Sequence, residues 1–418
     1  MQIDSRDEME AVQQNGLVKG HAYGVTNLKT ILNNEVPGLL SFLGAGNRSA
    51  VRLIRLRNPW GRKEWNGRFS DGSPEWNQIS QQKRKELGLI FEDDGEFWMA
   101  FDDFCKHFTS VSLCRIIYNS LIGSLLSGGA KNWSEGVFKG EWKQADKCGG
   151  CINNLGTFFN NPQYRFDVAN DDEPVMISLS QPDNRHMRSS GGGNYLTIGF
   201  YVMRIEINRK TRVRMLKAKA GCSAYGATRT RTLHMTLKPG RYCVIPTTFE
   251  PGQEGQFLLR VLTSYDCHPG TLEVDLPKQK LMGGLMSGGS IDAQYLMSVT
   301  VRQADGLPLS AKGSLPDPFV VLDCEGKTAK TPVVFNSTSP VFNETALFYR
   351  KTLAAPVNLQ VLNRNLMKDT LIGQTSMSCN QVTNGRVRQF QCPLQGKDSA
   401  AAGVIVIDVA IYTDLAAV

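Results

Sequence analysis

A histidine and an asparagine near the start of the sequence have neighbours that suggest a shared chemical role. His21 lies in Gly20-His21-Ala22-Tyr23, and Asn58 lies in Arg57-Asn58-Pro59-Trp60-Gly61. An imidazole can take a proton from a thiol nucleophile, and it does so well when a partner fixes its tautomer. An asparagine carbonyl oxygen can accept a hydrogen bond from the imidazole Nδ1–H without adding charge. We therefore interpret His21 as a general base and Asn58 as the group that orients it.

The residues around this pair resemble those of one known family. After Asn58 the sequence continues through Trp60, Glu64-Trp65, Asp71 and Asp94-Gly95-Glu96-Phe97-Trp98. This run resembles the second half of the protease core of calpains, which are calcium-dependent cysteine proteases. The resemblance implies that His21 and Asn58 belong to a Cys-His-Asn triad. It also implies that Trp60 is a gate that must move aside before the active site assembles, whereas a lone tryptophan after Asn-Pro would more often be a core residue.

The nucleophile of such a triad has no counterpart in this sequence. None of the ten cysteines lies in the Gly-x-Cys-Trp setting, after a glutamine, that the family's nucleophile shows. We therefore expect this chain alone to be inactive. Scattered cysteines in a chain of this length predict reduced thiols in the cytosol, because disulfide-dense secreted modules are far smaller. Cys148-Gly-Gly-Cys151 lacks the second pair of a zinc motif and the context of a redox motif.

The resemblance also implies a calcium site in the protease segment. The matching acidic positions are Glu64, Asp71, Asp94 and Glu96, with a backbone carbonyl near Glu92 as a further ligand. Calcium takes about six to eight oxygen ligands in irregular geometry, which two acidic loops can supply. In the family, bound calcium would pull the loops together and release Trp60 from the cleft. The alternative interpretation is a solvated acidic surface.

Basic residues are concentrated in one later segment. The formal net charge is +8, and nine Arg or Lys residues against one acid, Glu206, lie between Arg204 and Arg231. The candidate basic surface comprises Arg209, Lys210, Arg212, Arg214, Lys217 and Lys219. Such a stripe can attract an acidic phospholipid membrane surface, at about 1 kcal/mol per basic residue, or an acidic protein loop. A solvated strand face is the alternative, and nucleic acid is not expected because no binding motif accompanies the charge.

The pattern along the chain predicts a mostly β, multidomain protein. Alternating residues predict a strand over 51–57, and helical spacing of apolar residues predicts a helix over 97–105. Short β-patterned runs between turn residues predict an antiparallel β-sandwich over 131–276, followed by a Gly/Ser-rich linker over 277–293 and a second β-sandwich over 294–418. Residues 1–120 resemble the second protease-core half, truncated at its start. The two sandwiches resemble calpain domain III and a C2 domain, and the order is similar to that of atypical calpains with a C2 tail.

The expected C2 domain departs from the calcium-binding pattern. Asp317 is kept before Pro318, but Ser310 stands near the usual earlier acid. Asn363 and Asn365 stand where calcium-binding C2 domains carry aspartates, and Asp369 is one residue away from the usual final acid. Two neutral amides in place of two carboxylates remove much of the charge that holds calcium. We expect a weak site or none, and a contact to protein or lipid instead.

Two functions follow from these features. The first is a calcium-dependent cysteine endopeptidase that makes limited cuts in intracellular protein substrates, with the missing half of its core supplied in cis or in trans. A half-core without its partner would expose apolar surface. The second is a non-enzymatic regulator that binds membrane or protein through its sandwich and C2 domains. No leader or membrane-spanning run is apparent, so a cytoplasmic protein recruited to membranes is expected.

Overall fold

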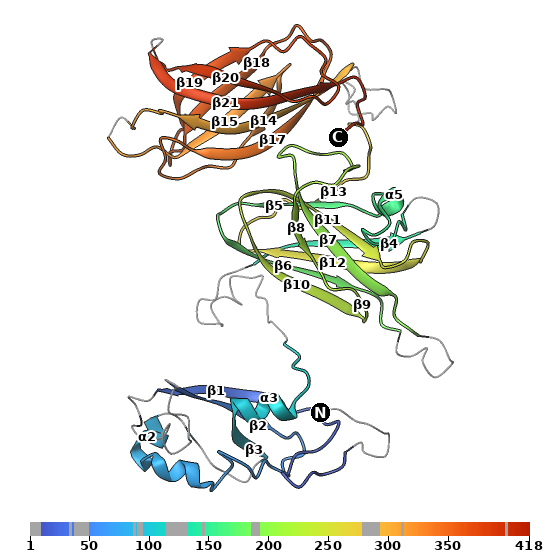
Figure 1. The fold of residues 1–418 in the computed structure, drawn as a ribbon, viewed down its shortest axis with the longest axis vertical. Helices are drawn as coiled ribbons and strands as arrows, with labels where there is room; N and C mark the ends of the chain where they lie inside the picture. The colour runs from blue at the N-terminus through green and yellow to red at the C-terminus, as the bar shows by residue number, and fades with distance from the viewer. Residues whose placement is uncertain are drawn as a thin grey trace. The chain divides into compact units, whose positions relative to one another are not determined.

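The protein is described by a computed structural model that covers residues 10–32, 36, 50–86, 89, 95–113, 133–143, 147–184, 193–277, 293–310, 313–397 and 400–418. Its Cα positions fall into two compact units, Met1–Ile116 and Ile117–Val418. Figure 1 shows that strands dominate the described part of the chain. The expectation of a mostly β protein is confirmed.

The first unit contains a three-stranded antiparallel sheet. The strands are β1 (Gly24–Leu32), β2 (Ala50–Arg57) and β3 (Glu96–Ala100), with β2 in the middle. The strand predicted over 51–57 is therefore confirmed. The helix predicted over 97–105 is wrong in its first part, because Phe97–Ala100 pair with Leu53–Leu56 as β3, and helix α3 (Phe101–His107) begins only after them. Buried side chains on both faces of β3 explain its continuous apolar run.

Both faces of this sheet are covered by apolar side chains. Leu53 and Trp98 belong to one buried cluster, whereas Ile54 and Phe97 belong to another, as the alternation of a strand requires. The short helices η2 (Pro74–Gln78) and α2 (Gln81–Glu86) follow β2 in the chain. The edge strand β1 leaves Val25 and Leu28 exposed.

The second unit begins with an antiparallel β-sandwich (Figure 1). One sheet has the order β10-β6-β12-β4, from β4 (Ser134–Trp142), β6 (Glu173–Ser180), β10 (Thr230–Leu237) and β12 (Gly255–Thr263). The other has the order β13-β5-β11-β7-β8, with β9 beside β7, from β5 (Tyr164–Val168), β7 (Thr197–Ile205), β8 (Lys219–Cys222), β9 (Gly226–Ala227), β11 (Gly240–Thr248) and β13 (Gly270–Thr271). Inward residues of both sheets, such as Phe166 and Leu259, form one core. Helix α5 (Leu155–Phe158) precedes β5.

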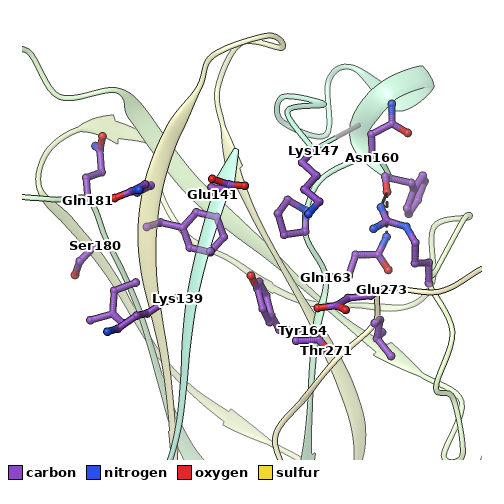
Figure 2. A pocket seen from close by; sticks show the side chains of 18 of the residues that line it. Lys139, Glu141, Lys147, Asn160, Gln163, Tyr164, Ser180, Gln181, Thr271 and Glu273 are labelled. Atoms are coloured by element: carbon purple, nitrogen blue, oxygen red, sulfur yellow. Dashed lines mark hydrogen bonds between the residues drawn. The ribbon is translucent and has the colours of Figure 1, made fainter. Parts of the chain in front are cut away.

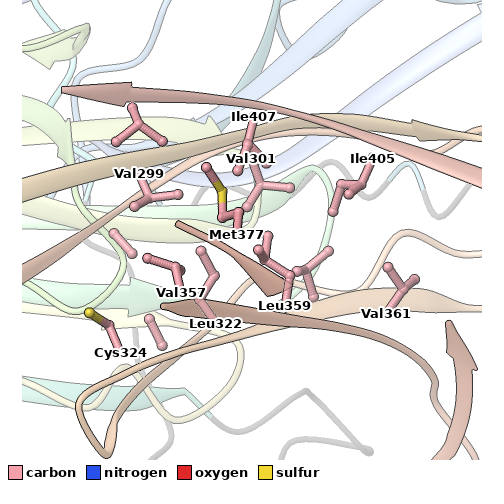
Figure 3. Close-up of a cluster of buried hydrophobic side chains, with 14 of the residues drawn as sticks. Val299, Val301, Leu322, Cys324, Val357, Leu359, Val361, Met377, Ile405 and Ile407 are labelled. Carbon is pink, nitrogen blue, oxygen red and sulfur yellow. The ribbon is translucent and has the colours of Figure 1, made fainter. Parts of the chain in front are cut away.

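An eight-stranded antiparallel set forms the C-terminal sandwich, in the order β16-β15-β18-β19-β20-β21-β14-β17. Its strands are β14 (Tyr295–Asp305), β15 (Pro318–Cys324), β16 (Lys327–Lys330), β17 (Val341–Arg350), β18 (Val357–Asn363), β19 (Thr370–Met377), β20 (Arg388–Gln395) and β21 (Ala401–Tyr412). Figure 3 shows Val299 and Ile407 meeting Leu322 and Leu359 in its core. The strand β17 lies at an edge of this set, and most of the predicted linker, residues 278–292, lies outside the described residues.

Candidate functional site

The structure brings His21 and Asn58 together at the end of strand β2. His21 Nε2 lies 3.0 Å from Asn58 Oδ1. The sequence predicted that Nδ1 would face the asparagine, and this detail is wrong: the ring is turned so that Nε2 does. Nδ1 is thus the ring nitrogen left for a proton transfer. The side chain of His21 is partly exposed.

Asn58 is fully buried, and its hydrogen bonds explain how it holds its position. Its Oδ1 also accepts a hydrogen bond from the main-chain N–H of Trp60 at 3.0 Å. Its Nδ2 donates to the carbonyl oxygens of Arg62 at 2.7 Å and Lys63 at 3.1 Å. A buried amide with both ends bonded cannot rotate without losing several hydrogen bonds, so its oxygen stays directed at His21.

Trp60 lies directly against the histidine. The two ring centroids are 4.4 Å apart, with the planes tilted by 44°, and 41% of Trp60 remains exposed. A side chain in this position covers part of the His21 ring. Trp60 thus touches His21, as the family resemblance implies for a gate, and the gating movement and the catalytic role of His21 stay predictions.

The two acidic segments meet beside this pair. The Oε1 of Glu64 accepts a hydrogen bond from the main-chain N–H of Gly95 at 2.9 Å, so the segment after β2 is tied to the start of β3. Gly95 has φ +83°, and a Cβ there would lie 2.7 Å from the Cα of Gly61, which leaves room only for glycine. Glu96 forms an ion pair with Arg55 at 2.6 Å. Glu92 and Asp94 lie outside the described residues.

A cavity of about 420 Å³ opens between residues 64 and 75. Glu64 and Asp71 line it together with Ser73 and Glu75, two residues that the sequence interpretation missed. The Ser73 Oγ and Glu75 Oε2 atoms are buried and have no hydrogen-bond partner, which fits a hard cation as a missing partner. Among the residues that the structure describes, no three acidic, histidine or cysteine side chains are close enough to hold a metal as they stand.

Several side chains of the predicted basic surface form ion pairs and hydrogen bonds within the protein. Arg209 is 2% exposed, so its assignment to a surface is wrong. It forms an ion pair with Glu206 and donates through Nη2 to the main-chain oxygen of Val418 at 3.0 Å. Lys217 Nζ lies 2.9 Å from Glu206 Oε1. Burial alone would raise the pKa of Glu206, but Arg209 and Lys217 overcome this effect and lower the pKa to about 2.

The other basic residues divide between exposed and engaged positions. Arg212 is partly buried and donates to main-chain oxygens of Phe159 and Asn161, and Arg214 forms an ion pair with Asp275 at 2.9 Å. Only three of the six candidates are exposed, namely Lys210, Arg214 and Lys219.

The segment that contains Arg209 joins the sandwich to the C2-like domain. The N–H of Ile207 donates to Thr345 O at 2.9 Å, and Asn208 exchanges two side-chain hydrogen bonds of 2.8 Å with the main chain of Leu347. Arg204 forms an ion pair with Glu344 on β17, although burial raises the pKa of Glu344 to about 7. We call residues 204–211, together with 344–349 and Val418, the joint.

The expected C2 calcium site is occupied by internal hydrogen bonds. The Oδ1 of Asn363 accepts from Asp317 N at 2.7 Å, and Asp317 Oδ1 accepts from the N–H of Asn336 at 2.8 Å. Asp369 Oδ1 accepts from Asn365 N at 3.1 Å. These loops are therefore held by amide and carboxylate contacts that need no ion.

A larger hollow of about 1240 Å³ lies on the sandwich, between β4 and the segment 155–164. Figure 2 shows Lys139 and Glu141 on one side and Gln163, Tyr164 and Glu273 on the other. Burial and, to a lesser degree, the negative charge of Glu273 raise the pKa of Tyr164 to about 12. Charges of both signs line the hollow and favour no single class of ligand.

Comparisons with known proteins match each of the three parts of the chain. The family described as calpain family cysteine protease matches residues 1–115, calpain large subunit domain III matches 138–262, and the C2 domain matches 295–394. Calpain-5 of Mus musculus is 39% identical over 375 residues, which are 88% of this chain and 56% of that protein. Calpain-5 of Caenorhabditis elegans is 32% identical over 426 residues, 98% of this chain and 63% of that protein. Calpain-9 of Homo sapiens is 37% identical over 272 residues, 62% of this chain and 37% of that protein.

The three matches follow one another as a protease segment, a domain III sandwich and a C2 domain, which is the arrangement of a calpain with a C2 tail. The chain belongs to the calpain family, and within it to the members that carry a C2 tail. It spans 56% to 63% of the Calpain-5 relatives.

Proposed function

We propose that this chain supplies the base-bearing half of a calcium-dependent cysteine endopeptidase. The observation that carries the proposal is the 3.0 Å contact between His21 and the buried Asn58, with Trp60 against the ring. In the assembled enzyme His21 takes the proton of a thiol and later gives it to the leaving amine, while Asn58 orients the ring. The thiol comes from a segment outside these 418 residues, in cis or in trans.

The exposed side chains of β1 support a partner for the first unit. Leu28 is 64% exposed and Val25 is 48% exposed on an edge strand of the sheet. An apolar edge of this kind is a liability unless another segment covers it. The missing half of the protease core, which would carry the thiol, would do so.

The experiment that tests this proposal is an intact-mass measurement on the endogenous protein. An antibody raised against residues 294–418 captures it, and its peptides are then sequenced. We expect a mass well above 46.2 kDa, with peptides that contain a cysteine in the Gly-x-Cys-Trp setting. A single species of 46.2 kDa that carries no bound second chain would overturn the proposal and favour the regulator.

Calcium would act in the cavity between residues 64 and 75. Glu64 and Asp71 would hold the ion, because both line this cavity and Glu64 is already tied to the start of β3. Bound calcium neutralises clustered carboxylates and fixes the two segments relative to each other. Trp60 lies between Asn58 and Glu64 in the sequence and contacts His21, and it would then leave the histidine ring.

A second candidate function, attachment to a membrane surface, is favoured by one loop of the C2 domain. Leu366 and Met367, between β18 and β19, are completely exposed, at 107% and 100%. Arg364 and Lys368 flank them. Two bare aliphatic side chains between two cations suit the boundary between acidic headgroups and lipid tails. Since internal hydrogen bonds hold the loop, attachment would not require calcium. No helix in the described part of the chain is long and apolar enough to cross a membrane.

Sedimentation with vesicles of phosphatidylcholine and phosphatidylserine tests this attachment. With calcium chelated, the full chain should bind, and the double variant Leu366→Ser, Met367→Ser should lose roughly 100-fold in partitioning, because each side chain contributes about 1.5 kcal/mol. The control is Val387→Ser, at an exposed valine elsewhere on the domain. Equal binding by the double variant would contradict the attachment by this loop.

A further inference from the structure

The cavity of residues 64–75 contains a buried carboxylate that is not among the predicted calcium ligands. Glu75 is 8% exposed and lines this cavity with Glu64 and Asp71. Its Oε2 atom is buried and has no hydrogen-bond partner. Ser73, 9% exposed, contributes a hydroxyl in the same state.

No described cation compensates this carboxylate. Arg68, which lines the same cavity, forms an ion pair with Asp103 at 2.9 Å. Arg84 donates its hydrogen bonds to two main-chain carbonyls of the η2 segment. A buried carboxylate without a counter-charge costs several kcal/mol, so such groups are usually paired or bind a metal.

We propose that Glu75 is a further calcium ligand of this cavity, with the Ser73 hydroxyl as a neutral neighbour. The inference rests on the calcium site proposed above and extends it by one carboxylate. Calcium ligands lie about 2.3–2.6 Å from the ion, and no three acidic, histidine or cysteine side chains of the described residues are placed to hold a metal as they stand. Calcium binding therefore draws the walls of the 420 Å³ cavity together, and it relieves the cost of the buried charge at the same step.

The position of Glu75 explains why this ligand matters for the switch. It lies at the start of η2, whose Trp76 packs in the core cluster beneath the sheet. Trp76 also donates through Nε1 to Ser70 O at 2.8 Å, on the same cavity wall. An ion held by Glu75 is thereby linked to the core of the unit as well as to its two acidic loops.

Calorimetric titration of the full chain with Ca²⁺ tests the inference, together with the thermal midpoint in chelator. Glu75→Gln keeps the shape of the side chain and removes its charge. We expect calcium affinity at this site to fall at least tenfold, whereas the midpoint without calcium stays equal or rises, because an uncompensated charge is gone. A structural role predicts the reverse, with a lower midpoint and an affinity within twofold of the original, and that result would overturn the inference.

Three further variants separate the possible failures. Asp71→Asn tests the proposed calcium site itself: if it weakens binding and Glu75→Gln does not, only the inference fails. If the unchanged chain takes up no Ca²⁺, the proposed site and the inference fall together.

Glu75→Asp keeps the charge and shortens the side chain, so the variant should fold like the original and still lose calcium affinity. Unchanged affinity would contradict direct ligation. Glu250→Gln, at an exposed glutamate of the sandwich, is the matched control.

Discussion

Asn58 joins several parts of the protease segment through its hydrogen bonds. Its side chain bonds to His21, to the N–H of Trp60 and to two carbonyl oxygens, while its own N–H donates to Gly95 O at 2.8 Å. One residue thus connects His21, Trp60 and both acidic segments by hydrogen bonds.

Replacing Asn58 with alanine should destabilise the first unit even without any catalysis. The change leaves buried carbonyl and N–H groups without partners, which costs about 2–4 kcal/mol. The measurement is a urea titration read by hydrogen exchange of peptides within residues 50–86. The control is Asn77→Ala, at an exposed asparagine of η2, which should change the free energy of unfolding by less than about 0.5 kcal/mol. An equal change in the free energy of unfolding for both variants would show that the hydrogen bonds of Asn58 do not stabilise the unit.

The sequence was enough to predict His21, Asn58 and Trp60 as site residues, because their neighbours are distinctive. It was not enough to predict a role for Ser73 and Glu75. Their importance comes from burial and from missing partners, and both depend on residues brought together by folding. The orientation of the His21 ring was missed for the same reason, since a sequence holds no information on which nitrogen faces Asn58.

The connection between β7 and β8 explains why much of the basic stripe is not a free surface. Ile207 and Asn208 bond to the edge strand β17, and Glu206 with Arg209 lies buried in the joint. The charge concentration that the sequence showed therefore serves, in part, to hold two domains together. The partners of this segment lie more than a hundred residues away in the chain, so periodicity and local charge could not indicate them.

The ion pairs of Glu206 in the joint should make the free energy of unfolding of the second unit fall at acidic pH. Because the pKa of Glu206 is lowered from 4.5 to about 2 by folding, its ion pairs stabilise the folded state fully above the unfolded value. This stabilisation is lost as the pH falls from about 4.5 through 2, and it amounts to about 3 kcal/mol. Glu206→Gln should thus lower the free energy of unfolding at pH 7, and the difference should shrink toward pH 2.

Urea unfolding of both proteins between pH 2 and 7 measures this response. A control is Glu141→Gln, at an exposed glutamate on β4, which should show no such convergence. If the difference caused by Glu206→Gln were the same at every pH, the ion pairs of Glu206 would not be the source of its stabilisation.

The strands themselves were largely predictable. Alternation gave the strand over 51–57 and the two sandwiches, because one inward face repeats with a period of two residues. The helix predicted over 97–105 was wrong at its start because the first residues of this segment are buried on both faces of a sheet. A continuous apolar run of that kind does not distinguish a buried strand from a helix.

In the whole chain, the order of a protease segment, domain III and a C2 domain supports the family assignment. The same order gives each part a separate task in our proposal. The first unit holds the base and the calcium cavity, the joint fastens domain III to the C2 domain, and the loop with Leu366 and Met367 contacts lipid.

The cleavage of an unfolded protein substrate shows whether His21 acts as the base of a calcium-dependent cysteine endopeptidase. The endogenous protein, captured through residues 294–418, is compared with the same protein carrying His21→Ala, in calcium and in chelator. We expect cleavage that requires calcium, is blocked by a thiol alkylating agent and falls by about 10³-fold or more in the variant, because the proposed base has been removed. Cleavage of equal rate in the variant, or none from the unchanged protein at any calcium concentration, would contradict this expectation.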